Sequence, residues 1–231
     1  METFCLVTPG NATNDYLFEL TNALLAKEVY DGEPFGKTTV RNFTISMSNG
    51  ATPSRKIDAF WAKGTIPWVK TGEVHNNLIF GTDECITELA LERTSARLLP
   101  KDTLVMALYG SGTAGRVALL QTPATTNQAC TAMICETPVR AFYLFVTLQG
   151  IYRKIDALTR GSVQQNLSKD IVADLDIPNI DEMVLERLGL PCIYEQIVAN
   201  AKESLHLAEV RDELLPKLIS GQIDVSNLCV L

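Results

Sequence analysis

The stretch LVMALYGSGTAGRVALL, residues 104–120, places an apolar run on each side of a glycine-rich turn. Gly110, Gly112 and Gly115 form the spacing GxGxxG, which in a dinucleotide-binding fold is followed at once by a helix and about 20 residues later by an acidic side chain. The next residues, RVALLQTPATTNQA, are β-branched and turn-forming types instead. The pattern therefore favours a β-hairpin whose small residues let the backbone approach a surface. A nucleotide site is the weaker alternative.

On both sides of this hairpin, short apolar runs separated by turn signals extend from about Lys37 to Pro178. Such runs predict a curled, barrel-like mixed sheet. The expected strands are TTVRNFTISM, IPWVKTGEV, ARLLP, DTLVMALYG, RVALL, ACTAMIC and ADLDIP. Residues 140–158 have the 3.6-residue apolar period of a helix that packs on a core. The sequence thus predicts an α+β fold with a β-rich domain over residues 37–180.

Beyond Pro178 the pattern changes to one amphipathic helix of about 30 residues, from Pro191 to just before Gly221. Its apolar stripe consists of Ile197, Ala201, Leu205, Ala208, Leu215 and Ile219. A helix of this length cannot pack wholly on one domain, so we expect the stripe to contact a second helix as in a coiled coil, although Pro216 should bend the last turns. A shorter helical pattern over residues 16–29 is either that second helix or a locally packed one. We therefore divide the chain into an N-terminal helical segment (1–36), the β-rich domain, and a C-terminal helical region that can dimerise (181–231).

The composition excludes several classes of protein. No window approaches 18 uninterrupted apolar residues, and the first residues lack the features of a secretory signal, so we expect no membrane contact and a cytoplasmic location. Six scattered cysteines are expected to be reduced thiols, and two distant histidines give no metal-binding spacing. We find no Gly-x-Ser-x-Gly elbow, P-loop lysine or paired metal histidines. The sequence therefore predicts no metal, no cofactor and no catalysis.

The net charge of −7 is unevenly distributed. Residues 181–224 contain nine acidic and four basic side chains, whereas residues 109–170 contain six basic and three acidic ones. A basic domain followed by an acidic helix suggests that the domain faces nucleic acid and the helix faces protein.

Hydroxyl, amide and cationic side chains gather in a few stretches of the predicted domain. Hydroxyls and cations donate to phosphate oxygens, and amides can pair with the edge of a base, although the same groups also satisfy backbone atoms in ordinary loops. The candidates for DNA binding are Thr52, Ser54, Arg55, Lys56, Lys70, Tyr109, Ser111, Thr113, Arg116, Thr126, Asn127, Gln128, Gln164, Gln165, Asn166 and Lys169. The two tryptophans, Trp61 and Trp68, are expected to be core or hinge residues.

Five stretches, taken in order, resemble the specificity subunit of type I restriction-modification systems. They are ATPSRKIDAFWAKGTIPWVKTGEV, ITELALERTSARLLPKDTLVMALYGSGTAGRVALL, PATTNQAC, GSVQQNLSKDIVADLDIP and RDELLPKLISGQIDV. The resemblance implies a target recognition domain that reads half of a split sequence in double-stranded DNA. It also implies a spacer helix that docks methyltransferase subunits, and separate methyltransferase and restriction (translocase) subunits for catalysis. A typical member has two recognition domains, whereas this chain has one. A half-length form could restore the two-fold layout by forming a homodimer through its helices.

The resemblance also limits what the shared stretches can do. Residues common to a family whose members read different sequences are expected to be scaffold or phosphate contacts, with the base readers in loops such as residues 75–88. The amides of residues 164–166 are expected to order the loop into a short helix capped near Ser168, or to touch the DNA backbone. Two alternatives stay open: an adenine methyltransferase or nucleotide-binding enzyme, which would need a cofactor loop and an Asn/Asp-Pro-Pro-aromatic motif, and a dimeric scaffold that binds no nucleic acid.

Overall fold

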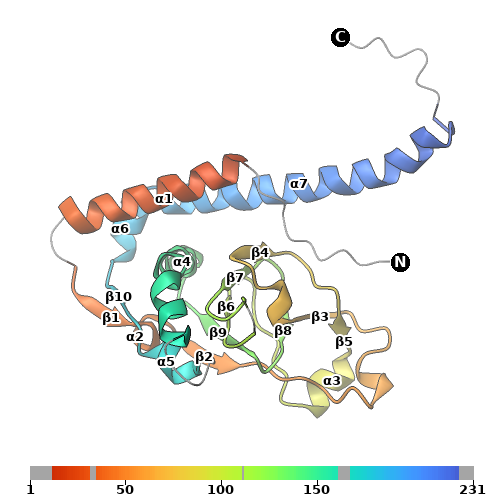
Figure 1. Ribbon diagram of the computed structural model, residues 1–231, viewed down its shortest axis with the longest axis horizontal. Helices are drawn as coiled ribbons and strands as arrows, with labels where there is room; N and C mark the ends of the chain where they lie inside the picture. The colour runs from red at the N-terminus through yellow and green to blue at the C-terminus, as the bar shows by residue number, and fades with distance from the viewer. Residues whose placement is uncertain (1–11, 32–34, 111, 161–166, 224–231) are drawn as a thin grey trace, which may run out of the picture.

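The structure is a computed structural model that describes residues 12–31, 35–110, 112–160 and 167–223. A β-rich lobe lies below a pair of long helices, one of which runs past the lobe at its C-terminal end (Figure 1). The strands are β1 (Lys37–Thr39), β2 (Ser46–Asn49), β3 (Ile66–Val69), β4 (Asn77–Ile79), β5 (Cys85–Ile86), β6 (Leu104–Ala107), β7 (Val117–Leu120), β8 (Thr125–Thr126), β9 (Cys130–Ile134) and β10 (Asp176–Pro178). The α-helices are α1 (Ala12–Asp31), α2 (Val40–Phe43), α3 (Glu88–Arg93), α4 (Pro138–Arg160), α5 (Lys169–Ala173), α6 (Glu182–Arg187) and α7 (Leu190–Ile219). Two short 3₁₀ helices are η1 (Asp58–Phe60) and η2 (Thr71–Glu73).

The glycine-containing stretch forms the hairpin at the centre of the main sheet, as predicted. Strands β6 and β7 pair antiparallel with Met106 opposite Val117, inside a five-stranded sheet of order β2-β9-β6-β7-β4. The β4–β7 pair is parallel and the other pairs are antiparallel, so the sheet is mixed. Every residue of β6 and β7 is buried, which explains why both strands read as continuous apolar runs.

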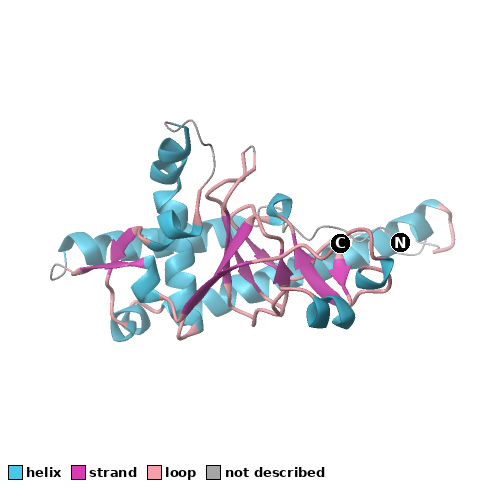
Figure 2. Cartoon of the chain, turned by 90° about the horizontal axis from the view of Figure 1, so that it is seen from below, coloured by secondary structure: helices cyan, strands magenta, loops and turns pink. Residues whose placement is uncertain are grey.

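The two faces of this sheet pack against different layers. Alternate residues such as Leu104 and Leu119 join α4 in the larger core, while Val105 and Leu120 join a smaller core with Val69. That smaller core lies towards a second sheet of order β5-β3-β8, and a third sheet pairs β1 with β10. Seen from below, the strands run through the middle of the lobe with helices around them (Figure 2). The α+β class, the mixed pairing and the helix over residues 140–158, which packs on the core as far as Ile151, are thus confirmed, with the strands divided over three sheets.

Several stretches differ locally from the sequence-based expectation, among them ARLLP, which forms only an isolated bridge between Leu99 and Ala124. TTVRNFTISM is not one strand, because Val40 and Phe43 are buried by one helical turn, in which the Thr39 hydroxyl caps the amide of Asn42. IPWVKTGEV ends as a strand at Val69 and continues into η2. Residues 75–88 are not a free loop, since Leu78 and Ile79 are buried in β4 and residues 85–86 form β5.

The second helix beside α7 is α1, so the first of the two alternatives for residues 16–29 is correct. The Asn14 amide donates to the carbonyl oxygen of Ile197 at 3.0 Å and accepts from Asn200 at 2.9 Å, and at the other end of α1 Glu28 pairs with Arg187. The two helices therefore run antiparallel (Figure 1).

The apolar stripe of α7 is only partly covered within the chain. Ile197, Ala201 and Leu205 are buried, Ala208 is half-buried, and Leu215 and Ile219 are 50% and 80% exposed. Pro216 lies inside the helix without ending it. No helix among the described residues is long and apolar enough to span a membrane.

Candidate nucleic-acid interface

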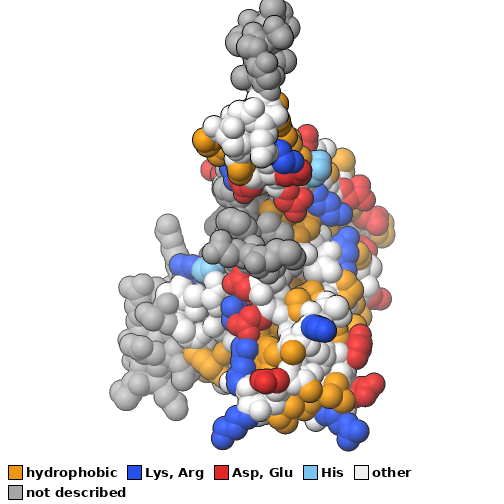
Figure 3. Space-filling model, turned by 90° about the vertical axis from the view of Figure 1, so that its right-hand side faces the viewer, with side chains coloured by type: hydrophobic (Ala, Val, Ile, Leu, Met, Phe, Trp, Pro, Cys, Tyr) orange, Lys and Arg blue, Asp and Glu red, His pale blue; other side chains and the backbone are white. Residues whose placement is uncertain are grey.

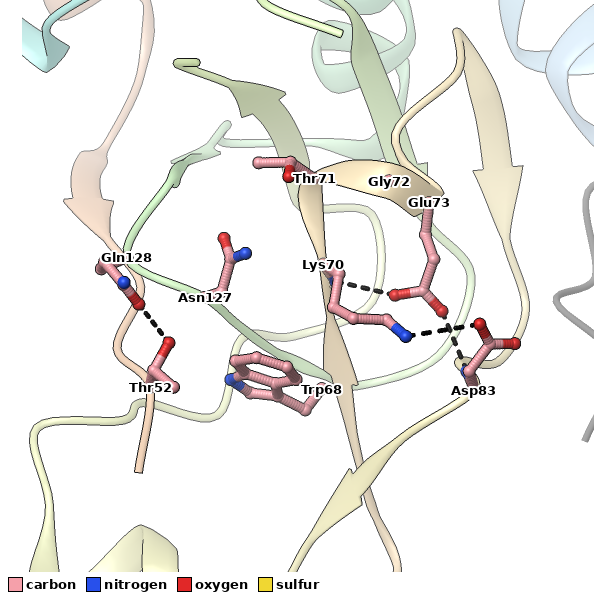
Figure 4. A pocket seen from close by; sticks show the side chains of 9 residues that line it. All are labelled: Thr52, Trp68, Lys70, Thr71, Gly72, Glu73, Asp83, Asn127 and Gln128. Carbon is pink, nitrogen blue, oxygen red and sulfur yellow. Dashed lines mark hydrogen bonds and ion pairs between the residues drawn. The ribbon is translucent and has the colours of Figure 1, made fainter. Parts of the chain in front are cut away.

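An open cavity of about 560 Å³, here called the polar cavity, lies at one edge of the smaller three-stranded sheet. Its lining residues are Thr52, Trp68, Lys70, Thr71, Gly72, Glu73, Asp83, Asn127 and Gln128 (Figure 4). Strands β3 and β8 are parallel, with Trp68 opposite Thr125. The chain therefore leaves both strands at the same edge, which places Lys70 beside Asn127 although 57 residues separate them. Four candidates from the sequence, Thr52, Lys70, Asn127 and Gln128, meet in this cavity.

The glycine turn joins the rim of the polar cavity through Gln128. The Tyr109 hydroxyl donates to the carbonyl oxygen of Gln128 at 3.2 Å, and the Thr52 hydroxyl donates to the Gln128 side-chain oxygen. Gly50 allows this approach, since a Cβ there would overlap the carbonyl oxygen of Thr126. Two stretches that are distant in sequence therefore converge on Gln128.

The turn itself requires its glycines. Gly110, Gly112 and Gly115 have φ angles of 124°, 77° and 82°, in the region that favours glycine. At its end, Arg116 lies 3.0 Å from Nδ1 of His75, measured from its Nη1. Because a guanidinium can only donate, His75 Nδ1 is the acceptor. The polar side chain of Arg116 is therefore directed towards His75.

The cations at this edge are paired with acids of the same chain. Arg55 forms an ion pair with Glu84, and the Lys70 ammonium lies 3.4 Å from Asp83 and 3.2 Å from Glu84. The hydrogen bond from Arg55 lowers the pKa of Glu84. Among the nine lining residues of the polar cavity, Lys70 is a cation and two are acids. On the end of the lobe seen in Figure 3, basic and acidic side chains lie side by side with apolar ones. Basic and acidic side chains are therefore mixed on this surface, where the sequence had suggested a basic one.

Arg55 also rests on the tryptophans. Its guanidinium carbon lies 3.6 Å from the ring centroid of Trp61 and 4.9 Å from that of Trp68, and the two indoles meet edge to face at 5.0 Å. Trp68 is 3% exposed, and its indole donates to the carbonyl oxygen of Ala51 at 2.9 Å. Trp68 is therefore a core residue, as expected, while the half-buried Trp61 supports a cation.

Sequence reasoning gave Glu73 no role, but its carboxylate organises the polar cavity. It is 3% exposed and accepts hydrogen bonds from the backbone amides of Lys70 at 2.7 Å and Asp83 at 2.9 Å. Burial raises the pKa of Glu73, although these two hydrogen bonds oppose the shift. The Lys70 amide is a local donor that caps η2, whereas the Asp83 amide reaches Glu73 only when residues 70–83 fold back on themselves.

The other candidates lie apart from the polar cavity or outside the described residues. The backbone carbonyl oxygen of Ser54 accepts a hydrogen bond from the Trp61 indole at 3.2 Å. Lys56 is exposed in a turn. Thr126 is buried in β8, and Thr113 lies in the glycine turn. Ser111, Gln164, Gln165 and Asn166 lie outside the described residues.

The segment that follows the amides is anchored beside the glycine turn. The backbone amide of Leu167 donates to the carbonyl oxygen of Leu108 at 2.8 Å, and Ser168 caps α5 by accepting from the amide of Ile171 at 3.2 Å. The predicted helix capped near Ser168 is therefore confirmed. Lys169 begins that helix and is half-buried.

In the part of the chain that the structure describes, no three His, Cys, Asp or Glu side chains are grouped so as to hold a metal ion. The described cysteines, Cys85, Cys130, Cys135 and Cys192, are free thiols. Burial raises the pKa of Cys130 and of Cys135 to about 12, so both thiols stay protonated and unreactive near neutral pH. Cys5 and Cys229 lie outside the described residues.

Comparison with known proteins places the lobe in a defined group. The family model for the type I restriction modification DNA specificity domain matches residues 43–179. The specificity subunit of the type I restriction enzyme HindI of Haemophilus influenzae is 25% identical over 181 residues, which are 75% of this chain and 39% of that protein. The EcoR124I/EcoR124II specificity subunit of Escherichia coli is 30% identical over 142 residues, 58% of this chain and 34% of that protein. The chain thus spans about two fifths or less of these relatives.

Solved structures of similar proteins share the fold. The type I restriction-modification system S subunit from M. genitalium has a TM-score of 0.59 at 16% identity, and the alignment covers 89% of this chain and 51% of the M. genitalium chain. The HsdS subunit of Thermoanaerobacter tengcongensis has a TM-score of 0.53 at 12% identity, covering 92% and 57%. At these identities the likeness concerns the fold alone.

Proposed function

We propose, from the premise that this chain belongs to the type I restriction modification DNA specificity domain family, that it is a recognition subunit which reads one half of a split DNA target. In this proposal it has no catalytic residues of its own and directs separate methyltransferase and restriction subunits. The observation that supports this function best is the convergence at one edge of the lobe. Parallel pairing of β3 with β8 brings Lys70, Asn127 and Gln128 together. The hydrogen bond from Tyr109 to Gln128 holds the glycine turn beside them.

Such an edge offers donors for the DNA backbone. The side-chain nitrogens of Asn127 and Gln128 can donate to phosphate oxygens, while their side-chain oxygens accept from the Ala129 amide and the Thr52 hydroxyl. The exposed cations Arg55 and Lys56 can contact phosphates, as can the half-buried Arg116. Contacts of this kind fix the position of the protein on the duplex without reading its sequence.

The test is the salt dependence of binding to a random-sequence duplex, followed by fluorescence anisotropy. Replacing Arg55, Lys56 and Arg116 by Gln should weaken binding on all sequences. It should also flatten the slope of log K against log salt by up to about 2.7, since each lost phosphate contact removes about 0.9. A matched control replaces Lys202, Arg211 and Lys217 on α7 by Gln, which removes the same charge from the helix. An unchanged steep slope in the first variant would count against the proposal.

We also propose that the distal half of α7 is where this subunit meets other polypeptides, including a second copy of itself. Beyond Leu205 the helix exposes apolar side chains that no described element covers, namely Leu207, Val210, Leu214, Leu215, Leu218 and Ile219. A contiguous apolar helix face of this kind is typical of a coiled-coil partner surface. Pairing through it would place two recognition domains in one assembly.

A further inference from the structure

Glu84 bridges the two cations at the edge of the polar cavity. One of its carboxylate oxygens receives the Arg55 guanidinium, and the other lies 3.2 Å from the Lys70 ammonium. The side chains of Arg55, Lys70 and Glu84 are 51%, 32% and 32% exposed, so solvent and ligands can reach all three. Asp83, 3.4 Å from Lys70, adds a second acid. One internal carboxylate thus uses both of its oxygens on two cations from different segments.

A phosphodiester presents two anionic oxygens in the same way, and Arg and Lys are the side chains that bind them. We infer that Arg55 and Lys70 form a binding site for one DNA phosphate, and that Glu84 occupies this site until the duplex displaces it. The inference rests on the proposed function and deepens it, because it names the group that the duplex must replace.

The surroundings are suited to such an exchange. Exposed ion pairs contribute only about 0–1 kcal/mol, so an incoming phosphate can displace the Glu84 carboxylate at small cost. The guanidinium of Arg55 would stay in position, because its stacking on Trp61 does not depend on Glu84. The backbone of Glu84 would stay as well, since its carbonyl oxygen accepts from the amide of Trp68 at 2.9 Å and from the Thr82 hydroxyl at 2.6 Å. Only the Glu84 side chain has to rotate away.

This exchange would weaken non-specific binding to DNA. Cations that are already neutralised add little to long-range attraction, so a phosphate gains them only when it is seated closely enough to replace Glu84. Binding to arbitrary DNA is thereby weakened more than binding to a well-fitted target, which raises the ratio between the two.

The decisive comparison is Glu84→Gln against Glu88→Gln. Both remove one negative charge from the same lobe, but Glu88 is an exposed residue at the start of α3. We expect E84Q to bind a random-sequence duplex at low salt roughly three- to tenfold more tightly than the wild type, with a slope of log K against log salt steeper by about one. E88Q should change affinity by less than about twofold. Equal gains in both variants would reduce the effect to net charge and overturn the inference.

A double substitution checks that the gain acts through the two cations. Adding Arg55→Gln and Lys70→Gln to E84Q should remove the gain, and a gain that persists would contradict the phosphate site. Circular dichroism at each step confirms that the lobe remains folded.

A second measurement keeps this inference separate from the proposed function. Both tryptophans of the chain lie next to Arg55, so tryptophan fluorescence reports on this site. Inorganic phosphate, titrated against chloride at equal ionic strength, should saturate E84Q at a lower concentration than the wild type or E88Q. Failure of all these proteins to bind duplex would end the proposed function. An unresponsive E84Q fluorescence would end the phosphate site, whatever the DNA result.

Discussion

The hydroxyl of Tyr194 on α7 donates a hydrogen bond to Asp102 at 2.5 Å, and so joins the long helix to the turn that precedes β6. The same hydroxyl accepts from the Gln121 amide at 2.7 Å, and the ring stacks on Phe142 at 4.9 Å. Burial, followed by the bond to Asp102, raises the pKa of Tyr194 strongly. Tyr194 therefore fixes α7 on the lobe together with the buried apolar side chains of Leu190, Ile197 and Ala201.

Tyr194→Phe should keep the stacking on Phe142 but leave Asp102 and Gln121 without their shared partner. We expect the free energy of unfolding to fall by about 1–3 kcal/mol, because buried polar groups that lose a hydrogen bond are costly. Urea denaturation measures this loss. Tyr16→Phe on α1, where the side chain is 63% exposed, is the control and should change stability by less than about 0.5 kcal/mol. Equal effects in the two variants would mean that the network contributes nothing.

Gly50→Ala should disturb the junction between β2 and β8. A Cβ at this position overlaps the carbonyl oxygen of Thr126, whereas one at Gly72 meets nothing within 4 Å. We expect Gly50→Ala to lower the free energy of unfolding by about 1–3 kcal/mol, as overpacking does elsewhere. Gly72→Ala, also beside the polar cavity, should be nearly neutral. Thermal denaturation of the two variants decides between them, and a Gly50→Ala protein as stable as the wild type would refute the close approach.

Stability should depend on pH through Glu73. Burial raises its pKa above the usual 4.5, so in the window between the unfolded and the folded pKa values the folded chain holds a proton that the unfolded chain lacks. The contribution of Glu73 is therefore fully present below the unfolded pKa and is lost as the pH rises through the folded pKa.

The measurement is the difference in unfolding free energy between the wild type and Glu73→Gln, taken from urea denaturation at several pH values. This difference should grow in favour of the wild type as the pH falls from neutral towards 4.5. Glu84, whose pKa is lowered by Arg55, contributes with the opposite sign, but it is present in both proteins and cancels. A difference that does not change with pH would contradict the raised pKa of Glu73.

The exposed end of α7 predicts how association responds to substitution. Leu214 and Leu218 are each 40% exposed. If they are buried in a dimer, Leu214→Glu with Leu218→Glu should raise the dimer dissociation constant by more than about tenfold, since each buried Leu contributes about 1.5–3 kcal/mol. Sedimentation velocity measures the change. Lys202→Glu, on the half of α7 beside α1, is the control, and a wild type that stays monomeric at high concentration would rule out self-association through this surface.

Much of the architecture was predictable because its causes are local. The glycine spacing of residues 110–115 predicted a hairpin, since positive φ angles are a property of individual residues. The helices α4 and α7 followed from apolar periodicity, and Ser168 from its capping chemistry. Thr39 and the short spacing of Val40 and Phe43 also encode α2, but the surrounding β-branched residues concealed so short a helix.

The polar cavity was predictable only in part. Thr52, Lys70, Asn127 and Gln128 could be chosen by residue type, but their meeting depends on the parallel pairing of β3 with β8, which no local pattern encodes. The role of Glu84 arises from Arg55 and Lys70, which reach it only in the folded chain. Glu73 accepts from the nearby Lys70 amide, but its second donor, the amide of Asp83, also reaches it only in the folded chain.

By itself, the sequence determined the elements whose geometry depends on residues within about one helical turn of each other: the glycine hairpin, the core-packed helix α4 and the long amphipathic helix α7. Only the tertiary structure decided which charges meet. Arg55 and Glu84 are 29 residues apart, and the contact between them exists only after three sheets have closed the chain upon itself. Coulombic pairing acts over a few ångströms of space, whatever the distance along the chain.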